Sequence, residues 1–239
     1  MHNVIWDMGG TLVDTYPQVD DALARAVWSG VPTPAHLAEV RELRTRSIAH
    51  AMDILSTRYE VDPTLLHRSY NDLISRWQTD PAPLMPGARE LLDTVHRVGG
   101  LNLVATHRDR RSAQALLGAL DVHVDDLVCA SDGFARKPDP QMYEVLLARH
   151  HLLPAEALCV GDRIIDMQAA AACAMPSALL VTPGQPVPDP GGTASESLAA
   201  PTLPPIRRAD PAPLCPVVIH HLRELIPVVS DCGAEGSSD

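Results

Sequence analysis

Short apolar runs alternate with segments of helical spacing along this chain, and this alternation limits its possible folds more than any other feature. The runs are rich in strand-favouring residues and end in polar or small ones. They cover Asn3 to Asp7, Leu101 to Thr106, Leu127 to Ser131, Ala157 to Asp162, Ala178 to Thr182 and Val217 to His220. The helical segments between them cover Ala88 to Val98, Arg111 to Leu120, Pro140 to His150 and Asp166 to Ala174. This alternation predicts an α/β fold, a parallel sheet with helices on both faces.

The alternation is interrupted between about residues 15 and 85, where no strand is expected. Helical patterns cover Val19 to Trp28, Ala35 to Tyr59 and Pro63 to Trp77. About 70 residues are far more than one crossover between strands needs. We therefore predict a small all-helical domain at 15–85, inserted into an α/β core formed by 1–14 and 86–230. The alternative is that these helices pack directly on the sheet.

A second interruption lies at residues 183–216, which hold 10 of the 22 prolines of the chain. Proline is incompatible with a helix interior or a central strand, so this segment is predicted to be a long exposed loop. Its role is open between a docking segment and a tolerated insertion. A last strand and a short helix are expected after it, and 231–239 is predicted to be a terminal tail.

Composition narrows the partners of the protein. The net charge is −11 and only 3% of the residues are aromatic, so neither nucleic acid nor an anionic membrane surface is expected to bind. The first residues lack the features of a secretory signal, and no apolar run is long enough to span a membrane, which predicts a cytoplasmic protein. Five cysteines without paired spacing indicate reduced thiols.

Three aspartates stand at predicted strand ends or just after them. Asp7 ends the first run, Asp162 ends the fourth, and Asp166 follows it four residues later. Because ligands of parallel sheets bind at the carboxyl ends of the strands, these carboxylates are expected to converge. Converging carboxylates repel one another unless a cation joins them, and oxygen ligands with open positions suit Mg²⁺. Gly9 and Gly10 would let the backbone after Asp7 turn sharply and approach a ligand.

Lys137 is the only lysine of the chain, and the other 18 of its 19 lysine and arginine residues are arginines. A lysine supplies a compact point charge that can contact a carboxylate and an anion together. Three carboxylates balanced by Lys137 and Mg²⁺ would make a nearly neutral site that accepts a phosphate dianion. Thr106, at the end of its run, can add a hydroxyl donor to a phosphate oxygen.

Taken together, these segments resemble the four motifs of the haloacid dehalogenase (HAD) superfamily of phosphotransferases. The first motif is similar to Asp7-Met8-Gly9-Gly10-Thr11, the second to Thr106, the third to Lys137 and the fourth to Gly161-Asp162 through Asp166. The resemblance implies a Rossmann-like parallel sheet with an all-helical cap of type C1, as in subfamily IA.

The resemblance also implies a role for each motif residue. Asp7 would attack a phosphate ester and form an aspartyl-phosphate. Lys137 and Thr106 would hold the transferring group, with contacts from Gly10, Thr11 and His107. Mg²⁺ would be bound by Asp7, the Gly9 carbonyl and Asp162, while Asp166 would be a further ligand or the partner of Lys137. The substrate implied is a small phosphorylated metabolite, whose identity the sequence leaves open, as it does the oligomeric state.

The chain departs from this family at Gly9, where phosphatases carry a second aspartate that serves as acid and base. Loss of such a group typically costs about 10²–10⁴ in rate. Three outcomes are open: a slow phosphatase, one in which His107 or Asp14 substitutes, or a non-catalytic phosphate-binding protein. A phosphonoacetaldehyde hydrolase needs an additional lysine in the cap, and a dehalogenase does not need the retained carboxylates. We therefore predict an Mg²⁺-dependent phosphoric monoester hydrolase, with a catalytically weak phosphate-binding regulator as the alternative.

Overall fold

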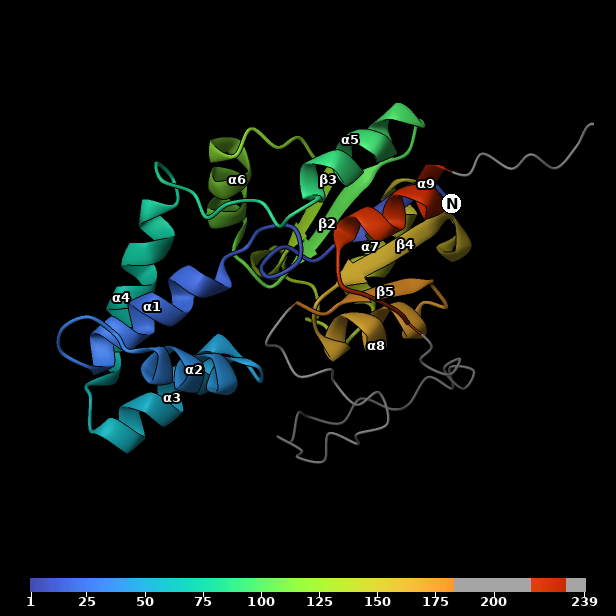
Figure 1. The fold of residues 1–239 in the computed structure, drawn as a ribbon. Coiled ribbons are helices and arrows are strands. Elements are labelled where there is room, and N and C mark those ends of the chain that lie inside the picture. The colour runs from blue at the N-terminus through green and yellow to red at the C-terminus, as the bar shows by residue number, and fades with distance from the viewer. Residues whose placement is uncertain (183–215, 231–239) are drawn as a thin grey trace, which may run out of the picture.

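The computed structural model describes residues 1–182 and 216–230, and it contains a six-stranded parallel sheet (Figure 1). The strand order is β3-β2-β1-β4-β5-β6, and every neighbouring pair is parallel. The strands are β1 (Asn3–Trp6), β2 (Asn102–Thr106), β3 (Asp126–Cys129), β4 (Ala157–Gly161), β5 (Ser177–Leu180) and β6 (Val217–Ile219). The predicted α/β fold with a parallel sheet is therefore confirmed.

Helices cover both faces of the sheet because alternate strand residues point to opposite sides. Val4 and Trp6 of β1 belong to one buried cluster, and Ile5 between them belongs to the other. The first cluster includes residues of α5 (Ala88–Arg97), α6 (Arg110–Ala119) and α9 (Ile226–Ser230). The second includes residues of α7 (Gln141–Arg149) and α8 (Ile164–Ala172). Short 3-10 helices lie at η1 (Ala130–Asp132), η2 (Pro154–Glu156) and η3 (Leu222–Leu225).

The strand order reverses at β1, which creates the crevice where ligands of open α/β sheets bind. The chain runs from β1 to its neighbour β2 and on to β3, and then returns to the other side of β1 to form β4. Trp6 pairs with Val104 on one side and with Val160 on the other. The carboxyl ends of β1, β2 and β4 therefore lie side by side.

Four helices form a separate group beside the sheet (Figure 1). They are α1 (Tyr16–Val27), α2 (Pro34–Arg44), α3 (Ile48–Tyr59) and α4 (Pro63–Arg76). The continuous helical pattern expected over Ala35 to Tyr59 is wrong at its centre, because the helix stops at Arg44 and a new one begins after Ser47. Ser47 has an extended backbone and its side chain accepts the His50 N–H, so it caps α3.

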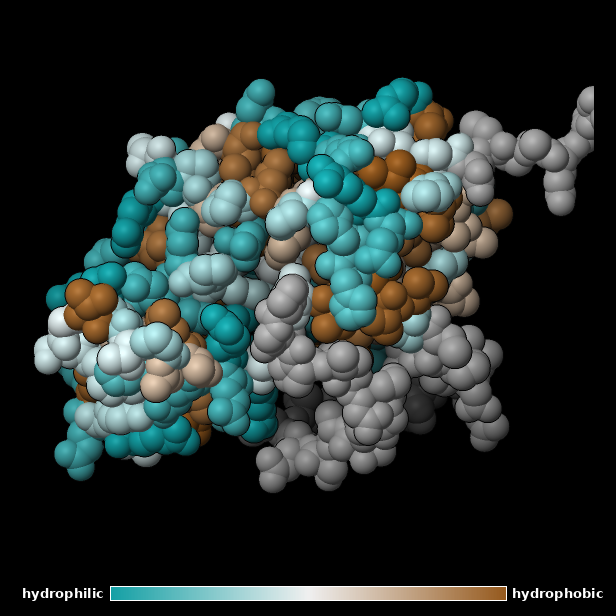
Figure 2. Space-filling view, in the orientation of Figure 1, coloured by the Kyte–Doolittle hydropathy of each residue, from teal (hydrophilic) through white to brown (hydrophobic). Residues whose placement is uncertain are grey.

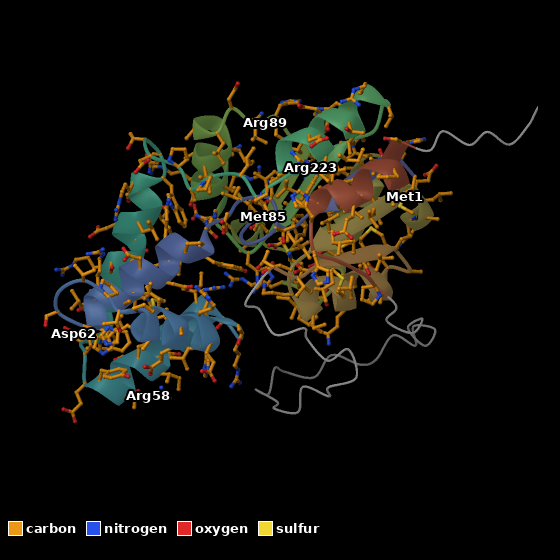
Figure 3. All side chains as sticks on the ribbon, viewed as in Figure 1. Met1, Arg58, Asp62, Met85, Arg89 and Arg223 are labelled. Atoms are coloured by element: carbon orange, nitrogen blue, oxygen red, sulfur yellow. The ribbon has the colours of Figure 1, made fainter. Side chains whose placement is uncertain are left out.

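The two chain segments that join this helical group to the sheet run beside each other. Val13 and Leu84 form an isolated antiparallel bridge. The Asp14 N–H donates to the Pro83 carbonyl at 2.8 Å, and the Met85 N–H donates to the Leu12 carbonyl at 3.0 Å. Met85 accordingly lies between the helical group and the sheet, whereas Asp62 lies at the far end of the group (Figure 3). On the face drawn in Figure 2, hydrophilic residues cover most of this group.

The expected last strand and short helix are confirmed by β6 and α9, with β6 pairing with β5. The proline-rich segment and the terminal tail lie outside the described residues, apart from Pro216. Cys129, Cys159 and Cys173 are free thiols, whereas Cys215 and Cys232 lie outside the described residues. Within the described residues, none of the helices has the length and apolar character to cross a bilayer.

Candidate active site

Asp7 lies at the carboxyl end of β1, where its N–H donates to the Val160 carbonyl at 2.8 Å. The residue is only 2% exposed. Its Oδ1 accepts a hydrogen bond from Lys137 Nζ at 2.5 Å, and no described residue is recorded as donating to Oδ2. Burial by itself would raise the pKa of this carboxyl, but the charges of Lys137 and Arg163 outweigh burial and hold it below its usual value. Asp7 is therefore an ionised carboxylate with one oxygen left for a ligand.

Lys137 lies behind Asp7 in the loop between η1 and α7, with a fully buried side chain. Its Nζ lies 2.5 Å from both Asp7 Oδ1 and Asp166 Oδ1, and it donates to the Ala105 carbonyl at 3.0 Å. Burial lowers the pKa of the ammonium, but the carboxylates of Asp166 and Asp7 outweigh it and raise the pKa above its usual value. The one lysine of the chain therefore stays charged and fixes the orientation of Asp7.

Asp166, in the first turn of α8, is fully buried and ion-paired with Lys137. Its Oδ2 accepts the Arg163 N–H at 3.2 Å. Of the two roles that the resemblance left open for Asp166, this geometry corresponds to partner of Lys137.

Asp162 follows β4 and is held by two hydroxyl groups. Thr11 Oγ1 donates to its Oδ1 at 3.1 Å, and the Tyr16 hydroxyl donates to its Oδ2 at 2.7 Å. Burial and the nearby charge of Asp7 raise the pKa of Asp162 to about 7. Two carboxylates thus share a buried space in which negative charge is incompletely balanced.

Gly10 makes the Tyr16 contact possible. Its backbone has φ +90°, and a Cβ atom built on it would lie 2.2 Å from the Tyr16 ring and 2.7 Å from Asp162 Oδ2. Only glycine fits both the conformation and the space. Gly10 and Thr11, predicted from the sequence to bind substrate, are absent from the lining of the pocket described below. The structure places them behind it, where they support Asp162.

The donor set at this edge of the sheet suits Mg²⁺. Among the described residues no group of three or more His, Cys, Asp and Glu side chains is placed to hold a metal ion. Mg²⁺ is commonly bound through one or two carboxylates, with waters and substrate oxygens completing its shell. Asp7 and Asp162 would supply those carboxylates and Gly9 a main-chain carbonyl, as the resemblance implies. The raised pKa of Asp162 is the observation that favours a cation here.

A pocket of about 320 Å³ opens between the sheet and the helical group. Asp7, Gly9 and Thr106 form its floor at the strand ends. The wall from the helical group is formed by Thr15, Tyr16, Arg44, Ser47, Ile48, Ala49, Met52 and Tyr70. The remaining wall is formed by His107, Arg108, Arg136 and Arg163. This volume is in the range of small-metabolite sites.

His107 lines this pocket, and its Nε2 is buried without a hydrogen-bond partner among the described residues. Burial, reinforced by the charges of Lys137 and Arg163, lowers the pKa of the imidazole to about 4. The ring is therefore neutral at pH 7. Asp14, the other substitute considered for the missing acid, lines a neighbouring pocket and not the one that contains Asp7.

The sequence analysis missed Tyr16, Arg108, Arg136 and Arg163 as pocket residues. Arg163 was visible inside the fourth motif, and Arg108 lies two residues after Thr106, so proximity to a motif was the available signal. Burial lowers the pKa of Arg163, but the carboxylate of Asp7, with further nearby groups, outweighs it and raises the pKa. Of the arginines in the helical group, Arg44 lines the pocket, whereas Arg25 pairs with Asp21 on the surface.

A parallel sheet that carries an aspartate–lysine pair at its switch point, beside a helical insertion, defines the class of this protein. The family model described as haloacid dehalogenase-like hydrolase matches residues 1–174. The chain therefore belongs to this family of hydrolases, as the resemblance of its motifs predicted.

The individual relatives described next each share less than 30% sequence identity with this chain. A phosphoglycolate phosphatase of Rhodospirillum rubrum is 29% identical over 184 residues, which cover 72% of this chain and 76% of that protein. An N-acetylmuramic acid 6-phosphate phosphatase of Pseudomonas aeruginosa is 26% identical over 174 residues, covering 69% and 75%. Among solved structures, a hydrolase from Streptococcus pneumoniae TIGR4 shares the fold with a TM-score of 0.59 and 24% identity, covering 75% of this chain and 92% of the other.

Proposed function

We propose that this protein is an Mg²⁺-dependent phosphoric monoester hydrolase that acts on a small phosphorylated metabolite. The observation that carries the proposal is the buried Asp7–Lys137 pair at the floor of a pocket of about 320 Å³. Two relatives in the family are phosphatases with different named substrates. They support the reaction type. Because their named substrates differ, the substrate of this chain has to be inferred from its own pocket.

In the proposed reaction Asp7 is the nucleophile. Its Oδ2 forms a bond to phosphorus while the bond from phosphorus to the ester oxygen breaks, which gives an aspartyl-phosphate and an alkoxide that takes a proton from water to become the alcohol. Water then attacks phosphorus, releases inorganic phosphate and regenerates the Asp7 carboxylate. Lys137 holds Oδ1 throughout, and the Thr106 hydroxyl and Arg163 would bind oxygens of the transferring group.

When bound, Mg²⁺ would neutralise negative charge on the transferring phosphate. Asp7, Asp162 and the Gly9 carbonyl would hold it, and Thr11 and Tyr16 would keep Asp162 oriented. A carboxylate has about four lone-pair sites, so the two hydrogen bonds that Asp162 accepts leave it free lone pairs for a metal ion.

Gly9 has no side chain that can give or take a proton, so other groups must perform the acid and base steps. We propose that the neutral imidazole of His107 accepts the proton of the attacking water, a role that its unpartnered Nε2 permits. Among the described residues that line the pocket, Asp7 is the one carboxylic acid, so none remains to protonate the leaving alcohol and esters with good leaving groups should react faster. Gly9 also supports the second candidate, a phosphate-binding regulator with little turnover.

We further propose that the helical group at 15–85 acts as a cap over the core formed by 1–14 and 86–230. The pocket is lined from both sides, and the two joining segments run side by side at Val13 and Leu84. Residues of the cap would then select the substrate.

Replacement of the nucleophile tests this function. Asp7→Asn should abolish turnover of p-nitrophenyl phosphate and of a panel of small phosphate esters, because an amide cannot attack phosphorus. Asp93→Asn, an exposed aspartate on α5, is the matched control and should keep full activity. Steady-state rates with Mg²⁺ and with EDTA measure both effects. Phosphate binding without turnover in the parent protein would support the regulator instead.

A further inference from the structure

We propose that the pocket binds phosphate esters that carry a second anionic group, and that Arg108 holds this second group. The inference rests on the proposed function for its choice of substrate class. The group would be a carboxylate or a second phosphate, both of which a guanidinium binds through paired hydrogen bonds.

The charge of the pocket lining supports this proposal. Four arginines line it, namely Arg44, Arg108, Arg136 and Arg163, and Asp7 is its one acidic lining residue. Arg44 is neutralised by Asp20, with Nε to Oδ1 at 2.7 Å and Nη2 to Oδ2 at 3.2 Å. No described carboxylate lies within ion-pair distance of the other three. With Asp7 subtracted, the three unpaired arginines leave the lining a net charge of +2, which matches one phosphate dianion. With Mg²⁺ bound, the pocket would hold more positive charge than one phosphate dianion neutralises.

The side chain of Arg108 is held in place by neighbouring residues, which suits it to bind a ligand at a defined position. Its guanidinium lies 4.7 Å from the centre of the Trp77 ring, and its Nη1 donates to Ser112 Oγ at 3.0 Å. These two contacts restrict the side chain and use one of its five N–H donors. The side chain is partly buried, and this burial lowers the pKa of the guanidinium. A buried cation with most donors unused is stabilised when an anion arrives.

Arg108 is also distinct from the groups that would serve the transferring phosphate. Arg163 directly follows Asp162, and its N–H donates to Asp166 Oδ2 at 3.2 Å, so Arg163 belongs to the carboxylate end of the pocket. Arg108 instead contacts Trp77 and Ser112, away from these carboxylates. The first residues of α3, Ile48 and Ala49, line the same pocket, and their end of the helix carries partial positive charge.

Binding of phosphonates tests the inference without turnover. Phosphonoacetate and ethane-1,2-bisphosphonate carry a second carboxylate or a second phosphonate, and ethylphosphonate is of similar size and has neither. Calorimetric titration in Mg²⁺ should show that at least one of the two probes with a second anionic group binds about 10-fold tighter than ethylphosphonate. The probe with the larger gain identifies the second group.

Arg108→Gln should reduce this preference to less than twofold while leaving the affinity for ethylphosphonate unchanged. Arg111→Gln changes an exposed arginine in the first turn of α6, three residues along the chain, and should keep the preference. Equal binding of all three probes to the parent protein would overturn the inference, as would an unchanged preference in Arg108→Gln.

Turnover separates this inference from the proposed function. If the protein prefers the probes with a second anionic group but hydrolyses none of the esters tested, the proposed hydrolase activity is wrong and the second-anion site stands. Hydrolysis with no difference between 2-phosphoglycolate and 2-hydroxyethyl phosphate would overturn the second-anion site and leave the hydrolase in place.

Discussion

Position 9 decides what chemistry the first motif can perform. Glycine leaves only a backbone carbonyl there, and a Cβ atom at this position would lie 3.2 Å from Thr15 Oγ1. That contact is tight, but a hydroxyl can shift by a few tenths of an ångström. A Cβ atom at position 9 is therefore accommodated by a small shift of Thr15, so the space at this position does not by itself require glycine.

Gly9→Asp should accordingly increase turnover of alkyl phosphates by about 10- to 100-fold, because a carboxylic acid could then protonate the leaving alcohol. p-Nitrophenyl phosphate should gain little, since its leaving group departs without protonation. The ratio of kcat values for the two esters measures the effect. Gly9→Asn, of equal size but without an acidic proton, is the control, and an increase shared by both variants would contradict the explanation.

His107 gives a second prediction at the scale of one residue. Its pKa is about 4 in the folded protein, against 6.5 for an ordinary histidine. Between these values the unfolded chain takes up a proton and the folded chain does not, so the free energy of unfolding falls as the pH is lowered from 6.5 to 4. Because the ring is partly exposed, this share of the loss is on the order of 1 kcal/mol.

His107→Gln should therefore lose less stability than the parent between pH 7 and pH 4.5, as measured by urea unfolding in EDTA. His67→Gln, an exposed histidine on α4, should behave as the parent. The cause assigned to the low pKa is wrong if all three proteins lose stability equally over this range.

At the scale of elements, the α1–α2 junction sets one wall of the pocket. Asp20 of α1 and Arg44 of α2 form a buried pair, with side chains 3% and 5% exposed. The Arg44 guanidinium also lies 3.7 Å from the centre of the Tyr16 ring. The same arginine thus joins two helices of the helical group and lies over the ring of the tyrosine that holds Asp162.

Asp20→Ala should destabilise the protein by about 3 kcal/mol, because it leaves the Arg44 charge buried without its partner. Its neighbour Asp21 offers a matched control: it pairs with Arg25 on the exposed side of α1, and Asp21→Ala should cost less than about 1 kcal/mol. Chemical denaturation measures both. Similar losses in the two variants would show that burial of the pair has no special effect.

At the scale of the whole molecule, three segments far apart in sequence meet at one edge of the sheet. Asp7, Asp162 and Asp166 contribute three negative charges, and Lys137 and Arg163 contribute two positive ones. Within this cluster, apart from Arg108 and Arg136 elsewhere in the pocket, negative charge is in excess until a cation binds beside the phosphate. Metal and phosphate binding should therefore be coupled.

Mg²⁺ and inorganic phosphate together should raise the thermal unfolding temperature by several degrees, more than the sum of their separate effects, since both bind only the folded protein. EDTA should reverse the increase, and Asp162→Asn should remove the coupling. Differential scanning fluorimetry measures the shift. Additive effects of the two ligands in the parent protein would argue against a shared site.

The sequence predicted the elements more reliably than their contacts. Local patterns located the strands and the helical insertion, because apolar periodicity is a property of neighbouring residues. The pattern failed at Ser47, where a single capping side chain ended one helix and began another. Motif spacing brought Asp7, Lys137 and Asp166 into one hypothesis, and the structure places these three within one ion-paired cluster.

The sequence by itself determined the parallel sheet, the family and the absence of a carboxyl group at position 9, since each depends on residue type and order along the chain. Only the tertiary structure decided that Lys137 lies behind Asp7, that Tyr16 contacts Asp162 across Gly10, and that Arg108 faces a shared pocket. These contacts join residues from segments that are distant in the chain, and local periodicity carries no information on such distances. The environment of His107 belongs to the same group, because burial that lowers a pKa comes from the packing of the whole molecule.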